Sequence, residues 1–204
     1  MKIRLLKFKR VQSTNNIAIK LIKKNLKYPV LIKSDLQTKG KGTMGKKWIS
    51  KKGNLFLSVL FIIDSKKISF RQYVILNALL IKKILSKYVE KNIKIKWPND
   101  LLIEKNKICG ILQEVIYHND RPFLVVGIGI NTNFSPKINN YKTASLRIYT
   151  KKKVNNDKIL KDVKERYEGF LNDVKLYNFS YLRKKIKLII SFVTLETQIS
   201  NCLF

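Results

Sequence analysis

The sequence contains few of the residues that build metal sites and disulfide frameworks. Two of its 204 residues are cysteine and one is histidine. Cys109 and Cys202 lie far apart, and neither has a second cysteine or a histidine at metal-ligand spacing. We therefore expect no zinc site and no disulfide, with both cysteines reduced. His118 stands in HNDRP between two apolar runs, which predicts a solvated turn residue rather than a catalytic base.

Long apolar runs are also missing. The longest, Leu55–Leu57 and Val59–Ile63, are divided by Ser58 and are far shorter than the roughly 20 residues of a membrane-spanning helix. At the N-terminus, charges interrupt the apolar residues of MKIRLLKFKRVQS, so the sequence predicts no signal-peptide core. We expect no membrane span and a cytoplasmic location.

Acidic residues are scarce, 13 against 43 lysines and arginines, which gives a formal net charge of +30. Such an excess can indicate nucleic-acid binding, because cations that neutralise phosphates supply most non-specific affinity. However, most of the basic residues are lysines, spread almost evenly from Lys2 to Lys187, whereas a dedicated surface would cluster its charge and favour arginine. We interpret the charge mainly as compositional drift that still attracts acidic partners. A basic nucleic-acid-binding module remains an alternative.

Hydrophobic residues make up 45% of the chain, enough to predict a folded domain, and the apolar periodicity changes type as in an α/β protein. Ser13 and Thr14 can cap a first helix, and the residues beyond 182 can form one or two strands at most. Between them the pattern predicts a strand over 28–36, a buried strand over 55–63, a helix over 71–91, an antiparallel meander over 93–130 and a helix from about residue 157.

A glycine-rich segment, Gly40–Gly45, follows the first predicted strand and is called the glycine loop below. Its G-x-G-x-x-G spacing alone suggests a dinucleotide site, but such a loop opens a helix, and here strand-like sequence follows. The loop instead brings backbone N–H groups and lysines close to an anion, the lysines being Lys39, Lys41, Lys46 and Lys47. The alternative is a flexible basic hairpin loop without a ligand.

Three further segments stand out in the second half. KWPND at Lys96–Asp100 places a cation, an indole, a rigid turn and a carboxylate at a strand end. Lys107 precedes an apolar strand that contains Gly110. In VGIGINTN, Gly127 and Gly129 remove side chains from one face of a central strand, so something is expected to lie flat against that face. Taken singly, each segment could also be an ordinary turn or surface residue.

Together these segments resemble the biotin protein ligase family. The resemblance covers residues 11 to about 170, and the combination KWPND followed by K-x-x-GIL-x-E distinguishes the biotin branch from lipoate ligases, which share the fold. The matching motifs are STN (13–15), Q-x-x-G-x-G-x-x-G-x-x-W (37–48), GNLFLSV (53–59), KWPND (96–100), K-x-x-GIL-x-E (107–114), GIGINTN (127–133) and ASL (144–146).

The resemblance implies a fold: an α/β (α+β) domain with a mixed, largely antiparallel sheet flanked by helices, similar to class II aminoacyl-tRNA synthetase catalytic domains. It also implies two regions, a catalytic domain over 1–178 and a remnant of a small C-terminal β domain over 179–204. No N-terminal DNA-binding module precedes STN, so a repressor role is not expected. A homodimer is compatible with the resemblance.

The resemblance further implies residue roles. Biotin binding would involve Ser13, Thr14, Asn15, Gln37, Gly40, Lys41, Gly42, Thr43, Lys107, Gly110, Gly127 and Gly129. ATP binding would involve Lys41, Trp48, Asn99, Asp100, Lys107 and Asn131. Catalysis would depend on Lys107, Lys41 and Asp100, with Asp100 as the ligand of a magnesium ion.

The implied reaction joins biotin and ATP into biotinyl-AMP and passes biotin to a lysine of a biotin carboxyl carrier protein, a subunit of acetyl-CoA carboxylase. Because a carboxylate attacks a phosphate, positioning and charge neutralisation should dominate catalysis. The chain departs from the family where many members carry G-R-G-R, since it has Lys41 and Thr43 there. A lipoate or other acyl ligase, and a decayed ligase with a shortened C-terminus, remain alternatives.

Overall fold

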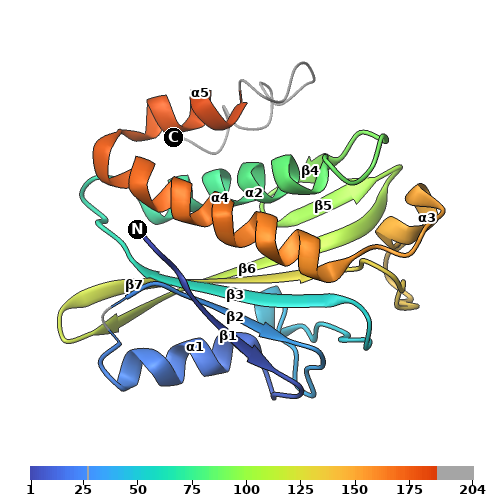
Figure 1. Ribbon diagram of the computed structural model, residues 1–204, viewed down its shortest axis with the longest axis horizontal. Helices are drawn as coiled ribbons and strands as arrows, with labels where there is room; N and C mark the ends of the chain where they lie inside the picture. Colours follow the sequence, from blue (N-terminus) through green and yellow to red (C-terminus); the bar gives the residue numbers. More distant parts are fainter. Residues whose placement is uncertain (27, 188–204) are drawn as a thin grey trace.

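The computed structural model describes residues 1–26 and 28–187 as one sheet with helices on both of its faces (Figure 1). The strands are β1 (Arg4–Phe8), β2 (Val30–Ser34), β3 (Leu55–Ile62), β4 (Lys94–Lys96), β5 (Asp100–Ile103), β6 (Asn106–His118) and β7 (Arg121–Ile130). The helices are α1 (Thr14–Lys23), the 3-10 turn η1 (Thr43–Gly45), α2 (Phe70–Leu85), α3 (Leu146–Thr150), α4 (Asn156–Leu176) and α5 (Phe179–Lys187).

The seven strands lie in the order β1-β2-β3-β7-β6-β5-β4. Only β1 and β2 pair in parallel; every other neighbouring pair is antiparallel. The predicted mixed, largely antiparallel sheet is therefore confirmed, and so is the meander, which forms β4 to β7. None of the helices in the described ranges is long and apolar enough to cross a lipid bilayer.

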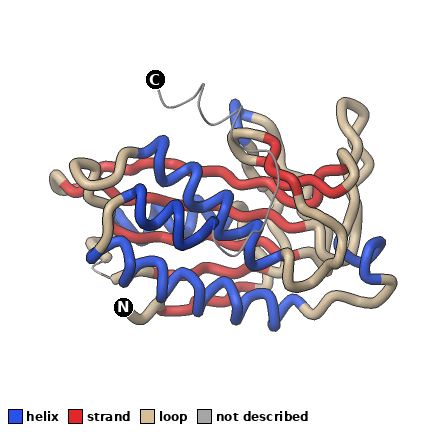
Figure 2. The backbone as a smooth tube through the Cα atoms, turned by 90° about the horizontal axis from the view of Figure 1, so that it is seen from above, coloured by secondary structure: helices blue, strands red, loops and turns tan. Residues whose placement is uncertain are grey.

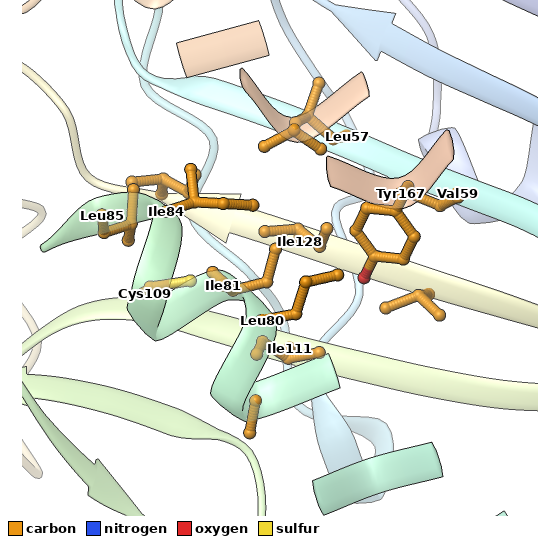
Figure 3. Close-up of a cluster of buried hydrophobic side chains, with 14 of the residues drawn as sticks. Leu57, Val59, Leu80, Ile81, Ile84, Leu85, Cys109, Ile111, Ile128 and Tyr167 are labelled. Carbon is orange, nitrogen blue, oxygen red and sulfur yellow. The ribbon is translucent and has the colours of Figure 1, made fainter. Parts of the chain in front are cut away.

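The larger core lies between the sheet and the α2–α4 layer, whose helices run across the same face in Figures 1 and 2. From Tyr73 to Leu85, helix α2 is buried at every position except Val74 and Lys83, because the sheet lies beneath it and α4 lies beside it. Figure 3 shows aliphatic side chains of the sheet and of α2 lying together, with the ring of Tyr167 from α4 at one side of the cluster. Besides Tyr167, the labelled residues are Leu57, Val59, Cys109, Ile111 and Ile128 from the sheet and Leu80, Ile81, Ile84 and Leu85 from α2.

The opposite face of the sheet is covered by α1 over only part of its length. Beneath the helix the strands present buried aliphatic residues, among them Leu60 and Val125, which pack on Ala18 and Ile22. Side chains alternate along a strand, so the next residues on this face are Ser58 on β3 and Gly127 on β7. At the N-terminus of α1 this face of the sheet therefore changes. Under the helix the strands present apolar side chains, and beyond it they present a hydroxyl or no side chain at all.

Two boundary predictions are wrong. Helix α2 ends at Leu85 rather than near residue 91, because the backbone bonds beyond Ser86 tighten to i→i−3, from the Lys87 N–H to the Ile84 carbonyl (3.3 Å) and from the Tyr88 N–H to the Leu85 carbonyl (2.9 Å). Residues 182–187, expected as strand, belong to α5. Asn178 accepts a hydrogen bond from the Tyr181 N–H (3.0 Å) at the start of that helix, and Leu182 is buried. The rest of the predicted strand region, 188–204, lies outside the described residues.

Glu168 on α4 ties the start of the chain to the helical layer. Its carboxylate accepts hydrogen bonds from the Lys164 ammonium (2.7 Å) and the Ile3 N–H (2.8 Å). The Lys164 hydrogen bond is the main reason that the pKa of Glu168 lies below its ordinary value. This carboxylate should therefore stabilise the fold above the ordinary glutamate pKa of about 4.3, and the contribution is lost as the pH falls through the lower, folded-state value.

We predict that Glu168→Gln lowers the free energy of unfolding by about 1 kcal/mol at neutral pH, because the charge-assisted bond to Lys164 is lost. Below the glutamate range the variant and the parent should be equally stable. Urea denaturation at both pH values checks this. Glu165→Gln, which removes a more exposed carboxylate 3.8 Å from Lys161, is the control and should change little. A deficit that persists in acid would contradict the electrostatic explanation.

Candidate functional site

A cavity of about 300 Å³ opens on the α1 face, where the sheet becomes polar and bare. The start of α1, the glycine loop, the β4–β5 turn and the beginning of β6 surround it. Most of the predicted site residues line this one cavity: Ser13, Thr14, Asn15, Gln37, Lys41, Gly42, Thr43, Trp48, Asn99, Asp100, Lys107, Gly110, Gly127 and Gly129. Residues separated by more than 100 positions in the sequence are therefore brought together.

Trp48 lies directly on two glycines of the sheet. A Cβ atom at Gly129 would stand 2.3 Å from the indole, and one at Gly110 would stand 2.6 Å from it. These two glycines face each other across β6 and β7, so together they make a bare patch wide enough for the ring. The prediction that something lies flat against the glycine face is confirmed, and the group that lies there is an indole of the protein itself.

The start of α1 contributes a connected set of neutral polar groups. The Thr14 N–H and hydroxyl both donate to Gln37 Oε1 (2.8 and 3.1 Å), and Ser58 Oγ lies 2.7 Å from Thr14 Oγ1. The Asn15 amide donates to Glu114 (2.6 Å). Asn15 packs against Gly127, where a Cβ atom would stand 2.4 Å from its Oδ1. This end of the cavity offers donors and acceptors fixed in place for a neutral polar ligand.

Lys107 provides a partly buried cation farther along the same face. Its ammonium lies 2.7 Å from the Asp100 carboxylate, and both side chains are less than one fifth exposed. The rings of Trp48 and Tyr141 lie 5.4 and 5.2 Å from the same ammonium. An ion pair and two aromatic rings thus fix the position of the charge, which suits a lysine that must meet an anion at a defined point.

The glycine loop folds back on itself over the cavity. The Gly42 N–H donates to the Lys46 carbonyl (2.7 Å), and Met44 at the tip has a left-handed φ of 53° and is 92% exposed. The loop touches the β4–β5 turn through the Asn99 amide and the Thr43 hydroxyl (3.4 Å). As predicted, a strand rather than a long helix follows this loop, so the dinucleotide interpretation does not apply.

Two predicted residues do not line the cavity. Gly40 packs behind the loop, where a Cβ atom would stand 2.5 Å from the Trp48 carbonyl oxygen, so this glycine allows the chain to pass close to itself. Asn131 is 1% exposed and borders a very small neighbouring cavity together with Trp48 and Lys107. Its amide donates to the Lys107 carbonyl (3.4 Å), while its Oδ1 is buried without a partner.

Several residues of the site were not singled out from the sequence. Ser58 and Glu114 lie within the motifs that carry the family resemblance, but the resemblance assigns no role to either. The sequence pattern that could have indicated them is a polar residue within an otherwise apolar strand. The cavity is also lined by Lys46 and Lys47 of the glycine loop and by Lys96 and Trp97 of KWPND, which the sequence had pointed to, and by Lys105, Tyr141 and Lys142, which it had not. Their positions depend on loop conformation, which periodicity does not report.

The residues excluded from chemistry remain outside the site. His118 lies at the far end of β6, where its ring nitrogen is 3.0 Å from Asn25 Oδ1. Cys109 is a free, fully buried thiol, and burial raises its pKa well above the ordinary range. Across residues 1–26 and 28–187, no three His, Cys, Asp or Glu side chains gather as a metal site.

We predict that Gly129→Ala displaces the Trp48 indole away from the sheet, because the new Cβ atom would stand 2.3 Å from a rigid ring that lies directly on the strand. Tryptophan fluorescence in a Trp97→Phe background should report the displacement, and the melting temperature should fall. Gly169→Ala is the matched control, since a Cβ atom there meets no other atom within 4 Å and alanine favours the helix. Unchanged Trp48 emission in the Gly129 variant would contradict the packing described above.

Comparison with known proteins shows the family to which this chain belongs. Residues 7–131 match the Biotin/lipoate A/B protein ligase family. The bifunctional ligase/repressor BirA of Bacillus subtilis is 34% identical over 128 residues, which are 62% of this chain but only 39% of that relative.

Solved structures give the same result. A biotin protein ligase from Aquifex aeolicus in complex with biotin and ATP is 30% identical, with a TM-score of 0.73 over 90% of this chain and 76% of the other. The biotin protein ligase of Leishmania major, at 18% identity and a TM-score of 0.74, shares the fold over 94% of this chain and 83% of its own. The chain therefore belongs to the biotin/lipoate protein ligase family.

Proposed function

We propose that this chain activates biotin with ATP and transfers it from biotinyl-AMP to a lysine of a biotin carboxyl carrier protein. The observation that carries the proposal is the order of groups along one cavity. Neutral hydrogen-bonding groups over Gly127 come first, then the Trp48 ring over Gly129, and then the Lys107–Asp100 pair. Biotin and ATP are also the molecules held by the Aquifex aeolicus relative.

Biotin has a neutral ureido ring at one end and a carboxylate at the other, so its site needs neutral polar groups at one end and a cation at the other. Ser13, Thr14 and Asn15 are each no more than 3% exposed, and Gln37 is held by Thr14 and Ser50. Buried, fixed groups of this kind discriminate against a ligand that leaves them unpaired. Trp48 supplies an apolar wall between the two ends.

In the first step, an oxygen of the biotin carboxylate bonds to the α-phosphorus of ATP, and the bond from that phosphorus to the leaving pyrophosphate breaks. Both reactants are anions, so the step needs a cation close to the reacting atoms. Lys107 meets this need. Asp100 and the two aromatic rings hold its ammonium in place before the ligands arrive, so little reorganisation accompanies the reaction.

Magnesium fits the same corner. Asp100 is the one acidic residue among the described side chains that line the cavity, and a single carboxylate suffices for an ion that phosphates and water also ligate. The ion pair with Lys107 uses Asp100 Oδ1, so Oδ2 can serve as the hard oxygen donor. When bound, magnesium would neutralise charge on the phosphates.

In the second step, the amine of the acceptor lysine attacks the acyl carbon and AMP leaves. The amine must first lose a proton, and no histidine lines the described part of the cavity. A water molecule would take the proton, because Lys107 and the magnesium ion would engage both oxygens of Asp100. The glycine loop has a second use here, since water that reached the mixed anhydride would hydrolyse it.

A lipoate ligase is the main alternative, because the matched family includes both activities. Biotin-dependent exchange of pyrophosphate into ATP separates the two: dependence on biotin supports the proposal, and dependence on lipoate would replace it. No exchange despite biotin binding would indicate a decayed enzyme. Salt-sensitive DNA binding without biotin affinity would favour the nucleic-acid module. Homodimer formation, the cytoplasmic location and the division at residue 178 stay predictions.

We expect Lys107→Met to lower biotin-dependent exchange at least about 100-fold, because the substitution keeps the aliphatic stem but removes the charge beside the α-phosphate. The cation–π and ion-pair contacts would be lost with it. Lys20→Met, on the exposed side of α1, is the control and should keep full activity. Exchange at the parental rate in the Lys107 variant would remove this residue from the mechanism.

We also expect Thr43→Arg to slow the escape of biotinyl-AMP. Thr43 carries no charge and contacts the β4–β5 turn only through one long hydrogen bond to Asn99, 3.4 Å, whereas a guanidinium could bind the phosphate of the intermediate as well. Quenched-flow measurement of free biotinyl-AMP should show less release in the variant. Thr43→Val, which removes the hydroxyl without adding charge, should not retain the intermediate better than the parent.

A further inference from the structure

Three lysines meet at one edge of the cavity. Lys107 lies at the start of β6, and Lys105 lies two residues earlier in the turn between β5 and β6. Lys142 comes from a distant segment that runs beside them: the Lys107 N–H donates to the Lys142 carbonyl (2.9 Å), and Lys107 forms a parallel bridge with Thr143. All three lysines line the cavity. Loop folding therefore brings two additional, exposed lysines to the backbone beside the proposed catalytic lysine, where they line the same cavity.

Neighbouring acids do not neutralise the two additional charges. Asp100 pairs with Lys107. Glu104, the residue before Lys105, pairs with Lys91 (3.0 Å), which does not line the cavity. Among the ion pairs of the described residues, none includes Lys105 or Lys142. Like charges gathered at one edge repel one another, so this arrangement is most favourable when an anion binds between them.

The turn that holds Lys105 is a tight hairpin. Glu104 and Lys105 form a two-residue hairpin loop in which both have positive φ values, 48° and 67°. Such loops usually contain Asn-Gly, because side chains disfavour this region. Here the conformation accompanies a lysine that lines the cavity.

We propose that Lys105 and Lys142 form a subsite for the β- and γ-phosphates of ATP, the part that leaves as pyrophosphate. The proposal rests on the function proposed above and extends it to two residues without an assigned role. Lys107 addresses the α-phosphate, and the breaking bond passes its electron pair to the β-phosphate side, where negative charge grows. Two cations beside Lys107 would stabilise that leaving group. They would also supply positive charge to the phosphates, which the uncharged Thr43 does not.

The test measures binding of inorganic pyrophosphate by titration calorimetry at constant ionic strength, so it needs no catalytic turnover. The variant Lys105→Ala/Lys142→Ala should bind pyrophosphate at least about tenfold more weakly, since two charge-assisted contacts are lost. Lys20→Ala/Lys23→Ala is the matched control: it removes the same charge from exposed positions of α1 that do not line the cavity. The control should keep the parental affinity. Lys105→Arg/Lys142→Arg should restore most of the binding.

Kinetics give a second readout. In the exchange assay the alanine pair should raise KM for ATP and leave KM for biotin unchanged. Equal loss of pyrophosphate affinity in the α1 control would mean that only the overall field matters, and it would overturn the subsite. Unchanged pyrophosphate affinity with a raised KM for the acceptor protein would also overturn it, in favour of an acidic docking surface. Pyrophosphate binding without biotin-dependent exchange would contradict the proposed function alone. Thermal melting verifies that each variant is folded.

Discussion

The site depends on one close approach, that of the Trp48 indole to the bare backbone of β6 and β7. Gly110 and Gly129 leave no side chain on the strand pair at this point, and the ring occupies the space that two Cβ atoms would fill. This contact excludes a side chain at either glycine, because a closely packed site has no room for an added methyl group. The indole in turn lies beside Lys107 and covers part of the cavity wall. The position of the cation therefore depends on the absence of two side chains.

The same sheet face separates the stabilising part of the molecule from the binding part. Under α1 the strands carry aliphatic residues that bury apolar surface, and beyond the helix start β3 carries Ser58 and β7 carries Gly127 and Gly129. This one sheet creates the cavity wall, because the sheet extends past the point at which α1 begins. The hydrogen bonds from Thr14 to Gln37 and from Asn15 to Glu114 then tie the helix start to two separate segments.

Electrostatics in this chain act locally in spite of the net charge of +30. Most lysines are exposed and solvated, and their fields are screened within roughly 10 Å at ordinary salt. The cavity is different because many of its lining side chains are lysines and only Asp100 is acidic among the described ones. Of these lysines Lys107 is the one that is partly buried, so its charge acts more strongly on a ligand than the exposed charges around it do. What matters for binding is the arrangement of a few cations around the pocket.

The sequence by itself determined the sheet-and-helix pattern and most of the site, because periodicity reports burial and the glycine spacing reports a bare strand face. It also predicted the STN helix start, the glycine loop and Lys107, which line one cavity. Only the tertiary structure decided which group covers Gly110 and Gly129, that Asn131 and Gly40 stand behind the cavity, and that Lys142 adjoins Lys107. It also made residues 179–187 a helix, through the cap at Asn178 and the burial of Leu182. Those outcomes depend on contacts between distant segments and on loop conformations, and neither leaves a periodic signal in the chain.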